Sequence, residues 1–444
     1  MSRLFPLTAE QRSLLYFQNL FGPGVALNLT TALPVPAEIS YDRVAGAVER
    51  LAKRHGGLRA QLGASAADGQ FVADETPPLL VAEEQSGCPG RVPARRAWLR
   101  CADLFDPRGP RRARFELIRQ GQRYGVLLGA LDHLVADGTS AEIVTRDLAL
   151  LLDGGALPEL PMTFQDVCRA QPSTDRVAEE AGEWARRLGD VAPLTGVMPH
   201  GAADGVRAQR DRHRAGGAGY HAVQLAAREL KCSPFVVIAA LCAISLWRRT
   251  AQERFLVHTP ISTRRDPARQ VSVGNFVNDR PLVCRVSPGE SLLTLAKRIR
   301  GSCAAALRHS YASVSDLVRA VRGYENCLQG ADADYVQLHV QVDDRRSAAG
   351  EGPSDRVERS VLGPFRPSGD VTCTTLRFHF SPDVTWTRTF FGGRRGGDEV
   401  AAEVSDDVLR LLELVPGSGT APVRWLAEEL PPVGGAIPVI EGDR

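Results

Sequence analysis

The stretch LLGALDHLVADGTSAEIV, residues 127–144, decides the fold of this chain. Its apolar run predicts a buried strand that ends near His133. An Asp-Gly turn follows at 137–138. Thr139 and Glu142 then form the Thr-x-x-Glu pattern of a helix N-terminus, so we predict that the helix begins at Thr139. The stretch therefore predicts a strand, a turn and a helix in direct succession.

A side chain at such a junction is presented rigidly. The unperturbed pKa of histidine is ~6.5, so His133 can accept a proton near neutral pH. The first N–H groups of the following helix face the same space and can stabilise a negatively charged oxygen. These features suit acyl transfer. A structural histidine beside a plain turn explains the local residues as well, so this stretch alone does not decide the function.

The composition is that of a soluble globular protein and argues against several functional classes of protein. The 444 residues are 43% hydrophobic and 24% charged, and 54 Lys and Arg nearly balance 52 Asp and Glu. This balance argues against nucleic-acid binding and against an anionic membrane surface. No apolar run reaches the ~18 residues that span a bilayer, and the N-terminus lacks the apolar core of a signal peptide. Nine cysteines without a C-x-x-C pair favour the cytoplasm and argue against a metal site.

Helices and strands alternate along the rest of the chain, which predicts an α/β or α+β fold. Helices are predicted within residues 8–21 (capped by Thr8), 41–62, 140–155, 235–250 and 291–310, and strands within 113–134 (a pair), 254–262, 333–344 and 374–391 (a pair). The strand within 333–344 alternates cleanly. Val336, Leu338, Val340 and Val342 share one face, and Tyr335, Gln337, His339 and Gln341 share the other. Residues 344–358 are predicted to form an exposed or disordered loop.

The central pattern, Asp132-His133-x-x-x-Asp137-Gly138, resembles the His-His-x-x-x-Asp-Gly motif of nonribosomal peptide synthetase condensation domains, which belong to the chloramphenicol acetyltransferase superfamily. Other segments resemble further motifs of this family in the same order. They are FPLTAEQRSLLYF (5–17), LAKRHGGLRA (51–60), LFDPRGP (104–110), EEAGEWARRLGD (179–190) and TPISTRRDPARQVSVGNFVNDRPL (259–282). Together they cover most of residues 4–320, and the last part of the chain matches more weakly.

The resemblance implies a V-shaped pseudo-dimer of two chloramphenicol-acetyltransferase-like lobes with a central substrate tunnel. We expect an N-terminal lobe at 1–170 and a C-terminal lobe at 171–444. No permanently bound cofactor is implied. The acyl or aminoacyl donor would be a phosphopantetheine thioester on an acyl or peptidyl carrier protein supplied in trans. The acceptor would be a small-molecule or carrier-bound amine or alcohol, and the product an amide or ester in the biosynthesis of a natural product such as an antibiotic.

The resemblance also assigns roles to residues. His133 would orient or deprotonate the nucleophile and support the tetrahedral intermediate. Asp137 would pair with Arg264 as a structural group, because a carboxylate held by arginine is a weak base. Gly138 would bring backbone donors close to the substrate. The candidates for lining the tunnel are Asp132, Asn278 (which we interpret as structural), His339 and Gln341, and the sequence leaves open whether the last two face the tunnel or water.

Three functional hypotheses remain. Asp132 replaces the first histidine of the motif, but the second histidine is retained. The chain shows no carrier-protein serine motif, and the match begins within its first ten residues, so we expect a free-standing condensation enzyme. The first alternative is an acyltransferase of the same fold that uses coenzyme A. The second is a catalytically silent module that docks a partner, and the retention of His133 and Asp137 argues against it.

Overall fold

The computed structural model describes most of the chain. The residues described are 4–21, 28–36, 38–63, 69–77, 79–83, 105, 111–120, 124–198, 206–329, 332–344, 372–393 and 396–433. The predicted loop at 344–358 lies outside them except for residue 344, and so does the segment 104–110 except for residue 105.

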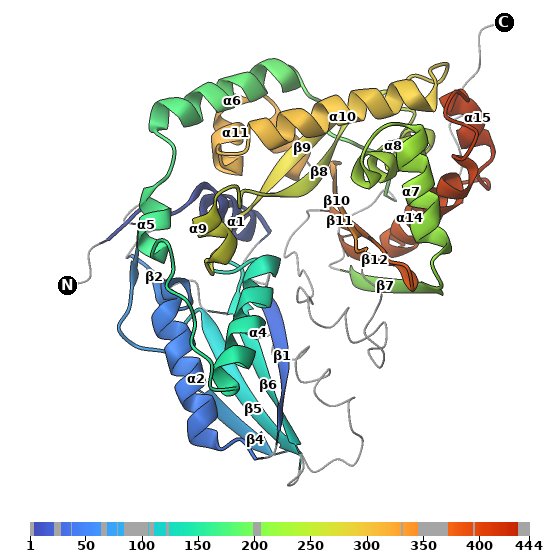
Figure 1. Cartoon of the computed structure of the whole chain (residues 1–444). Coiled ribbons are helices and arrows are strands. Elements are labelled where there is room, and N and C mark those ends of the chain that lie inside the picture. The colour runs from blue at the N-terminus through green and yellow to red at the C-terminus, as the bar shows by residue number, and fades with distance from the viewer. Residues whose placement is uncertain are drawn as a thin grey trace, which may run out of the picture.

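A four-stranded sheet forms the centre of the N-terminal half, with the order β1-β6-β5-β4. Its strands are β1 (Asn28–Pro36), β4 (Leu79–Glu83), β5 (Ala113–Gln120) and β6 (Tyr124–Asp132). β6 runs antiparallel to both of its neighbours, and β4 runs parallel to β5. Helices α2 (Tyr41–Arg54) and α4 (Gly138–Leu152) cover one face (Figure 1). Leu127 and Leu128 of β6 are both buried, as predicted for a strand enclosed on both faces.

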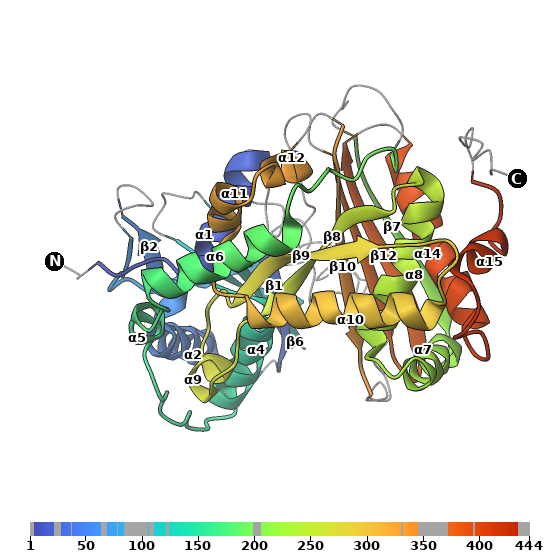
Figure 2. The same cartoon turned by 90° about the horizontal axis from the view of Figure 1, so that it is seen from above.

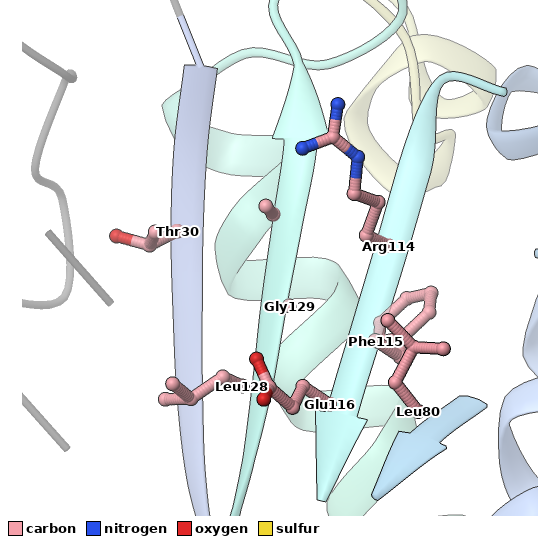
Figure 3. Close-up of a pocket in the computed structure, with 8 residues that line it drawn as sticks. Thr30, Leu80, Arg114, Phe115, Glu116, Leu128 and Gly129 are labelled. Atoms are coloured by element: carbon pink, nitrogen blue, oxygen red, sulfur yellow. The ribbon is translucent and has the colours of Figure 1, made fainter. Parts of the chain in front are cut away.

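The opposite face of this sheet carries a shallow pocket (Figure 3). It is lined by Thr30, Leu80, Arg114, Phe115, Glu116, Leu128, Gly129 and Ala130. None of the site residues predicted from the sequence belongs to this lining.

A six-stranded sheet forms the centre of the C-terminal half, with the order β7-β12-β11-β10-β8-β9. Its strands are β7 (Val206–Ala215), β8 (Arg254–Ser262), β9 (Val277–Arg285), β10 (Asp334–Val342), β11 (Thr372–Phe380) and β12 (Val384–Gly393). Helices α7 (Ala218–Glu229), α8 (Pro234–Thr250), α10 (Leu292–Arg308) and α14 (Gly397–Leu414) pack on one face (Figures 1 and 2). This leaves the other face of β10 and β11 for polar residues.

Shorter elements complete the described chain. They are η1 (Gly56–Arg59), β2 (Ala60–Leu62), β3 (Gln70–Val72), α5 (Phe164–Arg169), α6 (Thr174–Leu188), α9 (Pro267–Val271), α11 (Val314–Ala320), α12 (Tyr324–Gln329) and α15 (Val423–Glu428).

The predicted alternation of β10 is confirmed. Val336 and Leu338 are buried in the core beneath α8, and Val340 and Val342 pack against that core. The predicted helix and strand segments listed above from the sequence all contain an element of the expected type. Among the described residues, no single helix is long and apolar enough to cross a membrane. Helices α7 and α8 meet that test only as a pair bent by 93°.

Helix α1 (Ala9–Phe21) joins the two halves. Thr8 caps it as predicted, because the Gln11 N–H donates to Thr8 Oγ1 at 3.2 Å and the Thr8 N–H donates to Gln11 Oε1 at 2.9 Å. Ser13 on α1 donates to Asn278 of β9 at 2.7 Å. The first helix therefore packs against elements of the C-terminal half, although the two sheets lie on either side of residue 170. The division into lobes at that residue stays a prediction.

A row of ion pairs attaches the edge strand β7 to helix α14. Alternate arginines of β7 point to the same side and meet acids on α14. The pairs are Arg210 with Asp398, Arg212 with Asp406 and Arg214 with Glu413. The intervening Asp211 points to the other face of the sheet, where Arg388 of β12 donates to both of its carboxylate oxygens at 2.7 and 2.8 Å.

Candidate functional site

His133 lies on the turn between β6 and α4, and buried polar contacts hold this turn from both sides. Asp132 Oδ1 accepts a hydrogen bond from the Leu134 N–H at 2.9 Å, which closes the turn through a side chain. Arg112 donates to Asp132 Oδ2 at 2.9 Å. Gln11 donates to the Leu134 carbonyl at 3.1 Å. The backbone at His133 is therefore fixed by neighbours on both sides in sequence.

These contacts show what the aspartate in the first motif position does. The Asp132 side chain is enclosed in the turn and forms an ion pair with Arg112, which is also buried. Asp132 was a candidate for lining the tunnel, but its carboxylate is committed to the turn and to Arg112. A buried ion pair that also accepts a backbone hydrogen bond is a structural arrangement.

Asp137 caps helix α4. Its Oδ1 accepts a hydrogen bond from the Ser140 N–H at 2.8 Å, so the helix begins at Gly138. The prediction that Thr139 caps the helix is wrong. The carboxylate two residues earlier reaches the first turn and takes the capping position, and Thr139 lies exposed inside the helix.

The structure brings Asp137 and Arg264 together. Arg264 Nη2 lies 2.7 Å from Oδ1 and Nε lies 2.9 Å from Oδ2, so the pair is bidentate. The Asp137 side chain is 1% exposed and the Arg264 side chain is 5% exposed. The Phe276 N–H also donates to Asp137 Oδ2, at 3.1 Å. The Arg264 guanidinium lies over the Phe276 ring, 4.6 Å from its centre.

Ser140 extends this contact. Its hydroxyl donates to the Gly274 carbonyl at 2.8 Å and accepts from the Gly274 N–H at 3.1 Å. Helix α4 is thus joined to the segment that links β8 and β9 by side chains of Asp137, Arg264 and Ser140. These bonds connect the helix that follows His133 to the sheet of the C-terminal half.

Gly138 is exposed at the first position of α4, and a Cβ built there would meet no other atom within 4 Å. Nothing in the described fold therefore requires glycine at this position. Asn278, in contrast, is completely buried. It accepts from Ser13 at 2.7 Å and donates to the carbonyls of Ser310 and Ala312. It was a candidate for lining the tunnel, but it serves the structural role that its segment suggested.

The polar face of the six-stranded sheet supplies the second half of the site. In the register of β10 and β11, His339 lies beside Arg377 and Gln341 lies beside His379. His339, Gln341 and Arg377 line one pocket. The sequence left open whether the His339 and Gln341 face points to water or to a cavity, and the structure places both residues on this pocket.

A chain of hydrogen bonds orients His339. Gln337 Nε2 donates to Asp279 Oδ1 at 2.9 Å, so the Gln337 amide oxygen is directed toward His339. His339 Nε2 lies 2.9 Å from that oxygen and must donate to it. The neutral ring then carries its proton on Nε2, and Nδ1 is an acceptor.

Both histidines are held in the neutral form. Burial lowers the pKa of His133 below 6.5, against the opposing effects of its own backbone carbonyl, Asp137 and Asp132. Burial also holds the pKa of His339 well below 6.5, and the positive charge of Arg377, together with that of His133 whenever His133 is protonated, lowers it further. Each ring responds to the charge of Arg377, so the three groups lie within electrostatic range of one another. Burial lowers the pKa of Arg377 itself to about 10.

The sequence did not identify Arg377, Arg112 or Asp279 as part of this arrangement. Arg377 alternates with Thr375 and His379 on a predicted strand, so its polar face was visible, but the pairing of that strand with β10 was not. Among the described residues, no group of three or more His, Cys, Asp or Glu side chains could hold a metal ion.

We predict that Asp137→Ala lowers the free energy of unfolding by about 3–5 kcal/mol, because Arg264 is left buried without its carboxylate. Arg264→Ala should cost a similar amount, and the double variant less than the sum of the two. Chemical denaturation measures all three. As a control, Arg186→Ala removes an exposed partner of Glu183 and should cost about 0–1 kcal/mol. If Asp137→Ala is as stable as the parent but inactive, Asp137 acts in the reaction and its role is not structural.

We also predict that Asp279 makes stability depend on pH. Burial raises its pKa from 3.8 to about 6, so the folded protein retains a proton that the unfolded chain releases. This favours the fold at low pH, and the advantage is lost as pH rises through about 6. Relative to Asp279→Asn, the parent should lose roughly 2 kcal/mol between pH 4 and 7. Denaturation of both proteins across this range tests it, and parallel curves would contradict it.

Comparison with known proteins places this geometry in a family. The sequence model described as Condensation domain matches residues 1–329. Tyrocidine synthase 3 of Brevibacillus parabrevis is 24% identical over 325 residues, which are 71% of this chain and 5% of that protein. The structure of SgcC5 from Streptomyces globisporus has a TM-score of 0.69 and 21% identity, covering 94% of this chain and 100% of that one. The X-domain in complex with OxyB from teicoplanin biosynthesis has a TM-score of 0.72 and 18% identity, covering 97% and 96%. These structures share the fold, and the chain belongs to the condensation domain family.

Proposed function

We propose that this chain is a free-standing condensation enzyme. It would transfer an acyl or aminoacyl group from a phosphopantetheine thioester on a carrier protein to an amine or alcohol. The observation that carries this proposal is a neutral histidine, His133, on a turn fixed by Asp132 and Gln11, opposite the polar face that carries His339. The family assignment supports the reaction class.

His133 would act as the base. Its Nδ1 is enclosed beside the backbone carbonyl of His133 itself, which leaves Nε2 for the substrate. Nε2 takes the proton of the amine or hydroxyl as this group attacks the thioester carbonyl. The tetrahedral intermediate collapses, the carbon–sulfur bond breaks, and the proton passes to the departing thiol. The products are an amide or ester and a free pantetheine thiol.

Gly138 would let the substrate approach the start of α4. The space beside its Cα is open, and the positive end of the helix dipole faces that space. Asp137 and Arg264 would act as positioning residues, because they fix this end of the helix relative to the C-terminal sheet. His339 and Gln341 would form the opposite wall, with His339 Nδ1 as an acceptor for a substrate N–H or O–H.

We predict that His133→Ala reduces kcat/KM by about 10²–10⁴ without lowering the melting temperature, because it removes the base and leaves the turn contacts intact. His221→Ala, an exposed histidine, is the matched control. In the parent, activity should persist below pH 6.5 and fall when His133 becomes protonated, since its pKa is lowered. A folded His133→Ala protein with near-parental turnover would exclude this role.

We predict that the donor is carrier-bound. The surface of a docked carrier adds contacts that coenzyme A lacks, and one alkyl-sized contact alone is worth ~1–3 kcal/mol. Contacts kept in the transition state raise kcat/KM. We expect at least about a tenfold preference for acyl carrier protein over acyl-coenzyme A and over a short thioester mimic.

The measurement is kcat/KM for one acyl group on each of the three donors, with the acceptor fixed. Equal values for the carrier and coenzyme A would identify a coenzyme A-dependent acyltransferase. Binding of the carrier without transfer from any donor would identify a silent docking module.

A further inference from the structure

The parallel strands β8 and β10 pair at a single position, Gln337 with His258. At the next residue the Thr259 hydroxyl donates to the Leu338 carbonyl at 2.9 Å, so a side chain replaces a ladder hydrogen bond. Pro260 follows and has no N–H to donate. The two strands thus run side by side beyond this point without regular pairing.

A pocket lies where the pairing stops. Its volume is about 230 Å³, below the roughly 300–1,000 Å³ of sites that enclose a whole drug-sized ligand, so it suits one substituent of a larger molecule. It is lined by Thr259 and Pro260 of β8, His339, Val340 and Gln341 of β10, Arg377 and Phe378 of β11, Trp386 of β12 and Phe235 of α8. The lining combines residues from both faces of the sheet.

The character of the pocket changes with depth. His339, Gln341 and Arg377 come from the polar face. Phe378 is 1% exposed and belongs to the hydrophobic core, against which Val340 and Phe235 pack. The pocket therefore leads from the polar face, between two strands, to the apolar layer beneath α8. A site with a polar mouth and an apolar interior suits a hydrocarbon group attached to a polar head.

We propose that this pocket binds an apolar hydrocarbon substituent of one substrate while the reacting carbonyl lies at His133. The inference rests on the proposed function, because His339 belongs both to the pocket and to the wall opposite His133. The hydrocarbon group is either the tail of the acyl donor or the side chain of the acceptor. Val340 sets how much of it fits.

Val340→Phe tests the size of the pocket. With a fixed acceptor, kcat/KM is measured for octanoyl and acetyl carrier proteins. Each methylene expelled should cost about fourfold, so the octanoyl-to-acetyl ratio should fall at least about tenfold. Phe235→Ala enlarges the interior and should raise the ratio. Val342→Phe is the control, because Val342 packs against the same core but does not line the pocket. It should keep the parental ratio, and melting temperatures verify that each variant folds.

A second set of assays shows whether the hydrocarbon group belongs to the donor or to the acceptor. Here acetyl carrier protein is the fixed donor, and kcat/KM is compared for ethylamine and octylamine as acceptors. Sensitivity to Val340→Phe in this set assigns the pocket to the acceptor, and sensitivity in the first set assigns it to the donor. If neither ratio responds in folded Val340→Phe and Phe235→Ala, the inference is wrong.

A binding measurement distinguishes a failure of this inference from a failure of the proposed function. Calorimetry on His133→Ala measures octanoyl-pantetheine, acetyl-pantetheine and octylamine without turnover. Tighter binding of an octyl compound that Val340→Phe abolishes would support the pocket. If the parent protein, with His133 in place, also shows no transfer from any donor, that result would reject the proposed reaction and leave the pocket intact. Turnover with no preference for an octyl compound in either assay would reject the pocket and leave the reaction intact.

Discussion

The carboxylate of Asp137 meets the Arg264 guanidinium and the N–H groups of Ser140 and Phe276 at one buried point. Two of these partners lie in the segment between β8 and β9, and the third opens helix α4. One side chain therefore caps a helix and fixes it to the other half of the molecule. Removing a carboxylate from water costs several kcal/mol, and the bidentate arginine with two backbone donors offsets this cost. The position of His133 relative to the C-terminal sheet depends on this contact.

On each side of the site, buried polar groups that bind one another position a histidine. On one side Arg112 holds Asp132, and Asp132 holds the turn beside His133. On the other, Asp279 orients Gln337, which orients His339. Buried polar groups that satisfy one another have few alternative arrangements, so they fix a neighbouring ring more firmly than apolar packing does. Both rings are thus positioned by groups that the substrate need not touch, and burial keeps them neutral.

The sequence predicted the local elements well because hydrophobic periodicity reports burial directly. The alternation of β10 and the apolar length of α8 are examples. The contact between Asp137 and Arg264 was predicted from the family resemblance. The helix start was misplaced because two capping residues compete within three positions, and only the three-dimensional path of the chain selects Asp137.

Other contacts of the site could not be predicted from the sequence, because they depend on how the strands pair. Arg112 meets Asp132 only because β5 and β6 pair in one register. His339 meets Arg377 across a parallel pairing that no local pattern encodes. The single paired position between β8 and β10 is likewise a property of how the sheet twists and assembles, although Pro260 marks where a ladder is interrupted.

The arginine row of β7 bears on how this protein behaves at high concentration. β7 is the outer strand of its sheet, and an outer strand can recruit the strand of another molecule. Arg210, Arg212 and Arg214 place a positive charge at every second residue along it, each anchored by an acid on α14. A second copy of the strand would bring like charges together. The ion pairs thereby discourage aggregation through this edge while keeping the strand in place.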